Sequence, residues 1–141
     1  MKTLDRDQLN DLAQTLMEGP QALIAYKVRH FIDGGVEITN VFMYTLFITA
    51  GILDALPPVD QAHRLELLHH SAQGIFIPQA RAARLVLAHL NNDRGAVNAV
   101  YAEAETDYEK DEVFMALSPL PRAIMRGMPD GMLEFTVGGQ S

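Results

Sequence analysis

The sequence contains no cysteine and only three serines among its 141 residues. Without cysteine, disulfide bonds, thiolate metal sites, cysteine nucleophiles and thiol redox chemistry are all excluded. None of the serines, Ser71, Ser118 and Ser141, lies in a Gly-x-Ser-x-Gly turn, the motif that exposes the nucleophile of many hydrolases. The sequence thus gives no signal for nucleophilic catalysis, and we expect a protein that is not an enzyme.

Phosphate-binding loops and a basic surface are missing as well. The ten glycines form no Gly-x-Gly-x-x-Gly or Walker loop, which disfavours nucleotide cofactors. Eleven Lys and Arg residues stand against 18 Asp and Glu residues, a net charge of -7, so we expect no binding to nucleic acid. Arg81 and Arg84, three residues apart, resemble the phosphate contacts of a helix-turn-helix protein, but a solvated face or a salt bridge to an acidic partner explains them more simply.

No segment has the pattern of a membrane span or a secretory signal. The longest run without a charged residue covers residues 38–53, which as a helix would extend about 24 Å against a bilayer core of about 30 Å. The N-terminal residues are acidic and amphipathic, without the apolar core of a signal peptide. We therefore expect no membrane association and, together with the missing cysteines, a cytoplasmic location.

The apolar residues that are present recur at helical spacing. Hydrophobic residues make up 48% of the chain, and the length suits one domain. We expect a compact all-α bundle of about six or seven helices that forms a single domain over residues 1–137. Leu133, Phe135 and Val137 predict a short extended C-terminal tail, and residues 138–141 are expected to be disordered. Six helices are predicted at about 5–18, 20–32, 39–56, 60–73, 78–90 and 96–104, followed by helical turns at 109–117 and 124–128.

The segment 39–56 is apolar nearly all round. A helix of this kind is typical of the centre of a core or of an interface between subunits, and either Thr39 or Asn40 can cap its start. Its β-branched and aromatic residues also permit a strand, but its length favours a helix. We predict a central apolar helix here.

Four residues of the predicted fourth helix are candidate metal ligands. Glu66 and His69 have the Glu-x-x-His spacing that ferritin-like bundles use to bind metal, and His63, Glu66 and His70 can alternatively face one zinc or nickel ion. A ferritin-like site needs a second such pair, which the chain lacks. A solvated polar face is the simpler interpretation, so we expect no cofactor and keep a divalent metal as the alternative.

The strongest charge signal lies between residues 93 and 112. Seven acidic residues stand against two basic ones there, a balance of -5 out of the total of -7. Such a segment is either a solubilising surface or a docking site for a basic partner, and the methionines that follow suit a core or an adaptable binding surface. The candidate partner-binding residues are Glu103, Glu105, Asp107, Glu109, Asp111, Glu112, Met115, Met125 and Met128.

Three functional hypotheses follow. The first is a small soluble helical protein without enzymatic activity that binds another protein, as an adaptor, regulator or inhibitor, and that forms a homodimer. The second is a metal-binding helical bundle, or an enzyme, that uses the His/Glu cluster of the fourth helix. The third is a carrier of an apolar ligand, which predicts a cavity beside Phe42, Tyr44 and Phe47.

Overall fold

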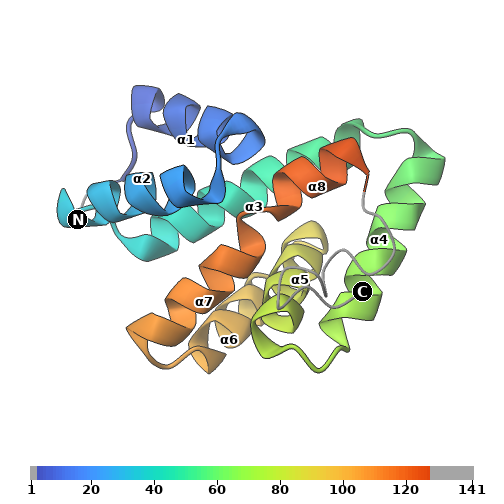
Figure 1. The fold of residues 1–141 in the computed structure, drawn as a ribbon. Helices are drawn as coiled ribbons and strands as arrows, with labels where there is room; N and C mark the ends of the chain where they lie inside the picture. Colours follow the sequence, from blue (N-terminus) through green and yellow to red (C-terminus); the bar gives the residue numbers. More distant parts are fainter. Residues whose placement is uncertain (1–2, 128–141) are drawn as a thin grey trace.

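The computed structural model describes residues 3–127, which form eight α-helices (Figure 1). The all-α, multi-helix fold predicted from the sequence is confirmed. The predicted extended segment at 133–137 and the predicted disordered end at 138–141 lie outside the described residues. The helices are α1 (Arg6–Glu18), α2 (Gln21–Asp33), α3 (Ile38–Ala55), α4 (Pro58–Ala72), α5 (Ile77–Leu90), α6 (Arg94–Glu103), α7 (Asp107–Leu117) and α8 (Leu120–Arg126).

Several helices begin at a residue whose side chain caps their first turn. Asp5 accepts a hydrogen bond from the backbone N–H of Gln8 at 2.9 Å, and the Gln8 side chain accepts one in return from the Asp5 N–H at 3.0 Å. Asp93 caps α6 in the same manner by accepting from the Ala96 N–H at 3.0 Å. Such caps satisfy N–H groups that have no partner inside the helix.

The starts of α3 and α4 differ from the predicted ones, as do those of α6, α7 and α8, which begin two to four residues earlier than predicted. α3 begins at Ile38 without a side-chain cap, so neither Thr39 nor Asn40 is its N-cap. The Asn40 side chain instead accepts a hydrogen bond from the backbone N–H of Leu4 at 3.1 Å and so ties the N-terminal segment to α3. α4 begins at Pro58, two residues before the predicted start, because proline needs no hydrogen-bond partner for its nitrogen in the first helical turn.

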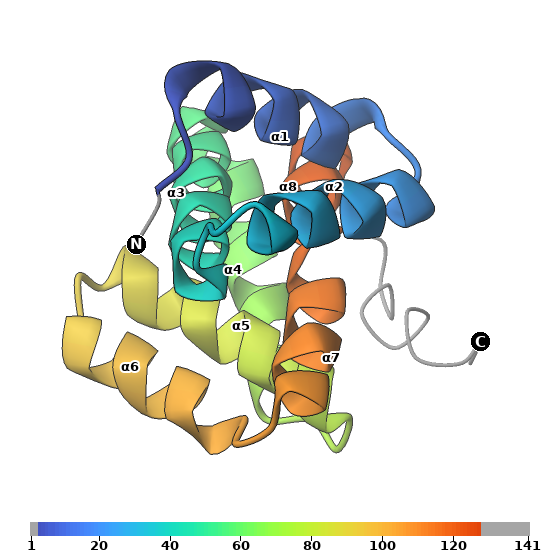
Figure 2. The ribbon, with the colours of Figure 1, turned by 90° about the vertical axis from the view of Figure 1, so that its left-hand side faces the viewer.

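The apolar helix α3 lies at the centre of the described fold. In Figure 1 it runs between the α1–α2 pair and the α5–α6 pair, and in Figure 2 it extends from α1 at one end to α5 at the other. It packs against α1, α4, α5 and α8. Two threonines lie on its buried face, and their hydroxyls donate to backbone carbonyls one turn earlier at 2.8 and 2.7 Å, so no polar group is left unpaired there. The buried residues of α3 are Val41, Phe42, Thr45, Leu46, Thr49 and Leu53.

The opposite face of α3 is not covered by the described residues. Met43, Phe47 and Gly51 follow one another at helical spacing and are exposed, with 70% of Phe47 accessible. By length and composition α3 is the one helix of residues 3–127 that qualifies as a membrane span, although core helices of soluble proteins pass the same test. Only about a third of the residues of α3 are buried. The remaining residues of this apolar helix are exposed or half-buried.

An arginine of α8 fastens the C-terminal helices to α1. The Arg122 Nε–H donates to the Met17 carbonyl at 2.8 Å, and its guanidinium also donates to the Gly19 carbonyl. These carbonyls end α1 and have no partner within the helix. Nearby, the Gln21 amide donates to the buried Ser118 hydroxyl at 2.7 Å, directly after α7. These bonds fix the position of α7, which carries the candidate site.

Candidate interaction surface

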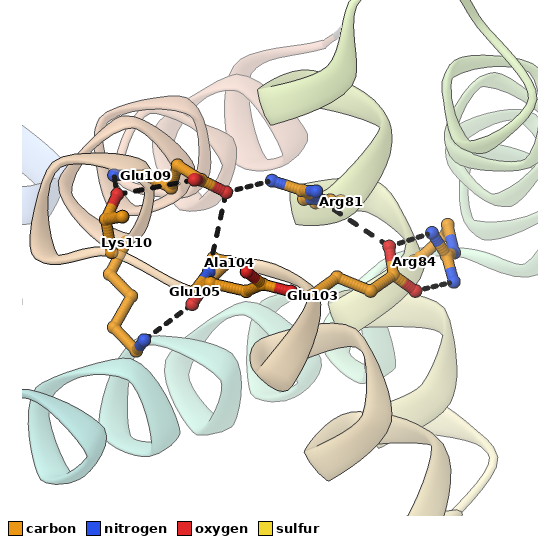
Figure 3. Close-up of polar contacts among 8 residues, drawn as sticks. Arg81, Arg84, Glu103, Ala104, Glu105, Glu109 and Lys110 are labelled. Carbon is orange, nitrogen blue, oxygen red and sulfur yellow. Dashed lines mark hydrogen bonds and ion pairs between the residues drawn. The ribbon is translucent and has the colours of Figure 1, made fainter.

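Two acidic residues of the predicted docking segment are paired within the chain. The Glu103 carboxylate accepts two hydrogen bonds from Arg84, at 2.9 and 2.6 Å (Figure 3). Arg81 lies between this carboxylate and that of Glu109, at 3.6 and 3.5 Å. The two arginines therefore form ion pairs with acids of their own chain. This pairing gives no support to the helix-turn-helix interpretation, in which Arg81 and Arg84 would contact phosphates. Glu103 and Glu109 are correspondingly less available to a partner.

The pairing changes the titration of both partners. The hydrogen bonds from Arg84 lower the pKa of the Glu103 carboxyl, with a further contribution from the positive charges of Arg84 and Arg81, although partial burial acts in the opposite direction. The same hydrogen bonds raise the pKa of the Arg84 guanidinium. Each group thus favours the charged form of the other at neutral pH.

Replacing Glu103 by Gln is expected to lower the free energy of unfolding at neutral pH by about 0.5–1 kcal/mol, the upper part of the range for exposed ion pairs, because the pair is bidentate. The pKa of Glu103 is lower in the folded chain than its ordinary value of 4.5, so the stabilisation is present above pH 4.5 and disappears as the pH falls through the folded pKa. Urea unfolding at pH 7 and at a series of values below 4.5 measures this difference. Glu105→Gln is the matched control, since the exposed Glu105 makes no ion pair among the described residues. A Glu103→Gln effect that persists undiminished in acid would contradict the assignment.

The junction between α6 and α7 is built by further polar contacts. Thr106 caps α7 by accepting from the Glu109 N–H at 3.1 Å, and the Glu109 carboxylate accepts from the Glu105 N–H at 3.4 Å. The Lys110 ammonium donates to the Ala104 carbonyl at 2.5 Å (Figure 3) and lies 5.3 Å from the centre of the Tyr101 ring. Burial, followed by nearby acidic charges, raises the pKa of the Tyr101 hydroxyl. Lys110 is therefore engaged at this junction.

A groove runs beside α7, on the side of the turn that joins α4 to α5. Its volume is about 670 Å³. Three of its apolar side chains are largely exposed: Ile75 at 86%, Ile77 at 59% and Tyr108 at 71%. Exposed apolar side chains that gather in one place, unlike single ones, indicate a binding surface. The groove is lined by Ile75, Phe76, Ile77, Pro78, Gln79, Tyr108, Asp111, Glu112, Met115 and Ala116.

Both charged side chains of the groove lining, Asp111 and Glu112, are acidic. Glu112 makes no ion pair within residues 3–127, and Asp111 has only a loose one, 3.8 Å from the exposed guanidinium of Arg29. A smaller hollow of about 240 Å³ adjoins the groove, since Asp111 and Met115 line both. The structure thus brings three predicted partner-binding residues together: Asp111, Glu112 and Met115.

The other predicted partner-binding residues have different surroundings. Glu105 and Asp107 are exposed at the start of α7 but do not line the groove. Met125 is 47% exposed on α8, which packs against α1 and α3, and Met128 lies outside the described residues. The groove residues that sequence reasoning missed are Ile75, Ile77 and Tyr108. The signal for two of them is the run of three apolar residues, Ile75 to Ile77, where the turn after α4 meets the start of α5, because turns at the surface are normally polar.

No family model, no curated protein and no solved structure matches this chain.

The candidate metal ligands do not converge. His63, Glu66, His69 and His70 are all exposed on α4. Within residues 3–127, no three His, Asp or Glu side chains are grouped so that they can hold a metal ion. The Glu-x-x-His spacing of Glu66 and His69 is present, but the described fold places no second ligand pair opposite it. The metal hypothesis consequently gains no geometric support.

The aromatic residues proposed to line a ligand cavity also lie apart. The Phe42 ring is buried edge-on against Tyr101 and Phe114, with ring centres 5.1 and 5.4 Å apart. Phe47 points away from this cluster and is exposed, and Tyr44 is half-buried. Because the Phe42 cluster fills the interior with closely packed rings, the geometry gives no support to a carrier site shared by these residues.

Proposed function

We propose that this chain is a soluble, cytoplasmic protein without enzymatic activity that binds a basic, amphipathic segment of another protein in the groove beside α7. The observation that supports this proposal is the grouping of exposed Ile75, Ile77 and Tyr108 in one groove whose charged lining residues are both acidic. It functions as an adaptor, regulator or inhibitor, because it acts by binding the partner segment and not by catalysing a reaction.

The apolar part of the groove supplies the affinity. Burying a largely exposed isoleucine or tyrosine side chain removes apolar surface from water, which is worth about 25 cal/mol per Å². Tyrosine is among the residues most often found at the energetic centre of interfaces, because its large ring loses little conformational entropy on binding. Tyr108 on α7 and Ile77 at the start of α5 are therefore the principal anchors.

The acidic part of the groove selects the partner. Asp111 and Glu112 lie one turn after Tyr108 on α7, and the exposed Asp107 precedes them by one turn. A partner that carries Lys or Arg beside its apolar face meets opposite charge here, whereas an acidic segment is repelled by these carboxylates and by the net charge of -7. The best fit is an amphipathic helix with basic flanks, the type of ligand that binds apolar grooves through residues at helical spacing.

Site-specific photocross-linking tests this proposal in the cells that naturally produce the protein. The photoreactive residue p-benzoylphenylalanine replaces Ile77 in the groove or, as the matched control, Val59, which is 81% exposed on α4. We expect an adduct with another protein from position 77 only, and mass spectrometry should identify a cross-linked peptide with apolar residues beside Lys or Arg. Three results would contradict the proposal: no adduct from position 77, equal adducts from both positions, or a cross-link from position 77 to residues 128–141 of the same chain.

A further inference from the structure

The exposed face of α3 carries a protruding aromatic ring next to a hollow. Phe47 is 70% exposed, and the centre of its ring lies 6.4 Å from that of His89 on α5. His89 also lines a hollow of about 220 Å³, together with Met43, which precedes Phe47 by one turn of α3. The ring and the hollow therefore adjoin each other on one face of the molecule.

The hollow has the dimensions and lining to accept a ring of this kind. A cavity of about 150 Å³ is enough to hold benzene, so one of about 220 Å³ accommodates a phenylalanine side chain. Met43 and Val97 give it apolar walls, and methionine adapts its shape to an aromatic partner. The two charged residues of its lining, Asp93 and Arg94, have opposite sign, so the rim carries no net charge.

The charge of the protein limits what can cover this face. The chain has a net charge of -7, so two copies repel each other over most orientations. Residues 38–53 of α3 contain no charged side chain, so two copies can approach on this face without pairing like charges. Gly51 lies on the same exposed face of α3 as Met43 and Phe47 and has no side chain, so a second copy can approach the helix backbone there. A Cβ built at this position meets nothing within 4 Å.

We propose that two copies of this chain form a dimer with twofold symmetry through the exposed face of α3, in which Phe47 of each copy enters the hollow beside Met43 and His89 of the other. A ring and a hollow on one face are self-complementary under a twofold axis, because each copy supplies both halves of the contact. The hollow, which is lined by α3, α5, α6 and the turn between α5 and α6, thereby gains an occupant, and the most exposed ring of α3 is buried. This interface is separate from the groove beside α7, so either surface can fail its test without affecting the other.

Sedimentation equilibrium of the full chain over a range of concentrations tests the dimer. We expect the wild-type chain to be dimeric. Phe47→Ala should raise the dissociation constant of the dimer by at least about tenfold, since aromatic residues at the centre of an interface dominate its affinity. Gly51→Lys should have a similar effect. The lysine side chain has open space around it in a single copy, but in the dimer it would place a charged group against the apolar face of the second copy. Val59→Ala, an exposed apolar residue on α4, is the matched control and should leave the dimer unchanged.

Circular dichroism and thermal unfolding establish that each variant is folded. The proposal is overturned if the wild-type chain is monomeric at every concentration, or if folded Phe47→Ala and Gly51→Lys dimerise like the wild type. Phosphatidylcholine vesicles provide a second arm, since α3 is long and apolar enough for a bilayer. A wild-type monomer that sediments with these vesicles, and loses that binding in Phe47→Ala, would assign the face to a membrane and also overturn the dimer.

Discussion

Replacing Phe42 by Ala is expected to lower the free energy of unfolding by about 3–5 kcal/mol, the usual cost of truncating a buried phenylalanine. Phe42 is 2% exposed and makes edge-on contacts with Tyr101 of α6 and Phe114 of α7. The substitution removes both aromatic contacts and leaves a cavity where three helices meet. Because a domain of this size is stable by only about 5–15 kcal/mol, Phe42→Ala should lose a large fraction of the stability of the chain.

The control for this prediction is Phe47→Ala, the same substitution one and a half turns further along α3. Phe47 is 70% exposed, so its truncation should change the free energy of unfolding of the monomer by less than about 0.5 kcal/mol. Urea unfolding of both variants, at concentrations low enough to keep the wild type monomeric, measures the contrast as a shift in midpoint at constant slope. Equal losses for the two variants would show that the orientation of α3 described above is wrong.

The helices themselves could be predicted from the sequence because most of them are amphipathic. The first helix, predicted at about 5–18, extends over Arg6–Glu18 behind the capping box of Asp5 and Gln8. In α3 the same reasoning predicted a helix and its central place, but not its orientation. A helix that is apolar all round has no polar face that marks the outside. The structure buries the polar Thr45 and Thr49, whose hydroxyls bond to the helix backbone, and exposes the apolar Phe47.

The candidate site was predicted only in part, because its parts come from distant segments. The acidic segment could be recognised from the charge count, and Asp111 and Glu112 do line a groove. The count gave no information on pairing, since the contact of Glu103 with Arg84 exists only where α6 packs against α5. The opposite wall of the groove, Ile75 and Ile77, lies at the start of α5, so most of α5 and the whole of α6 separate it from α7 in the sequence. Tertiary packing, which no local pattern encodes, creates the site.

Replacing Tyr108 by Ala is expected to raise the dissociation constant for the partner segment by about 30-fold, which corresponds to about 2 kcal/mol. The Tyr108 ring is 71% exposed in the free protein, so its removal should not unfold the chain. It is the one aromatic side chain that α7 contributes to the groove, and an aromatic anchor surrounded by aliphatic side chains is the usual energetic centre of such an interface.

The double charge reversal of Asp111 and Glu112 to Lys should mainly slow association and reduce its dependence on salt.

Binding of the partner in the groove beside α7 can be measured by titrating the cross-linked partner segment, as a synthetic peptide, into Tyr108→Ala and Tyr26→Ala. Tyr26 is 69% exposed on α2 and does not line the groove, so it matches Tyr108 in residue type and exposure. We expect a loss of affinity of about 30-fold for Tyr108→Ala and of less than about twofold for Tyr26→Ala. Equal affinities of the two variants would contradict this expectation and move the binding surface elsewhere on the molecule.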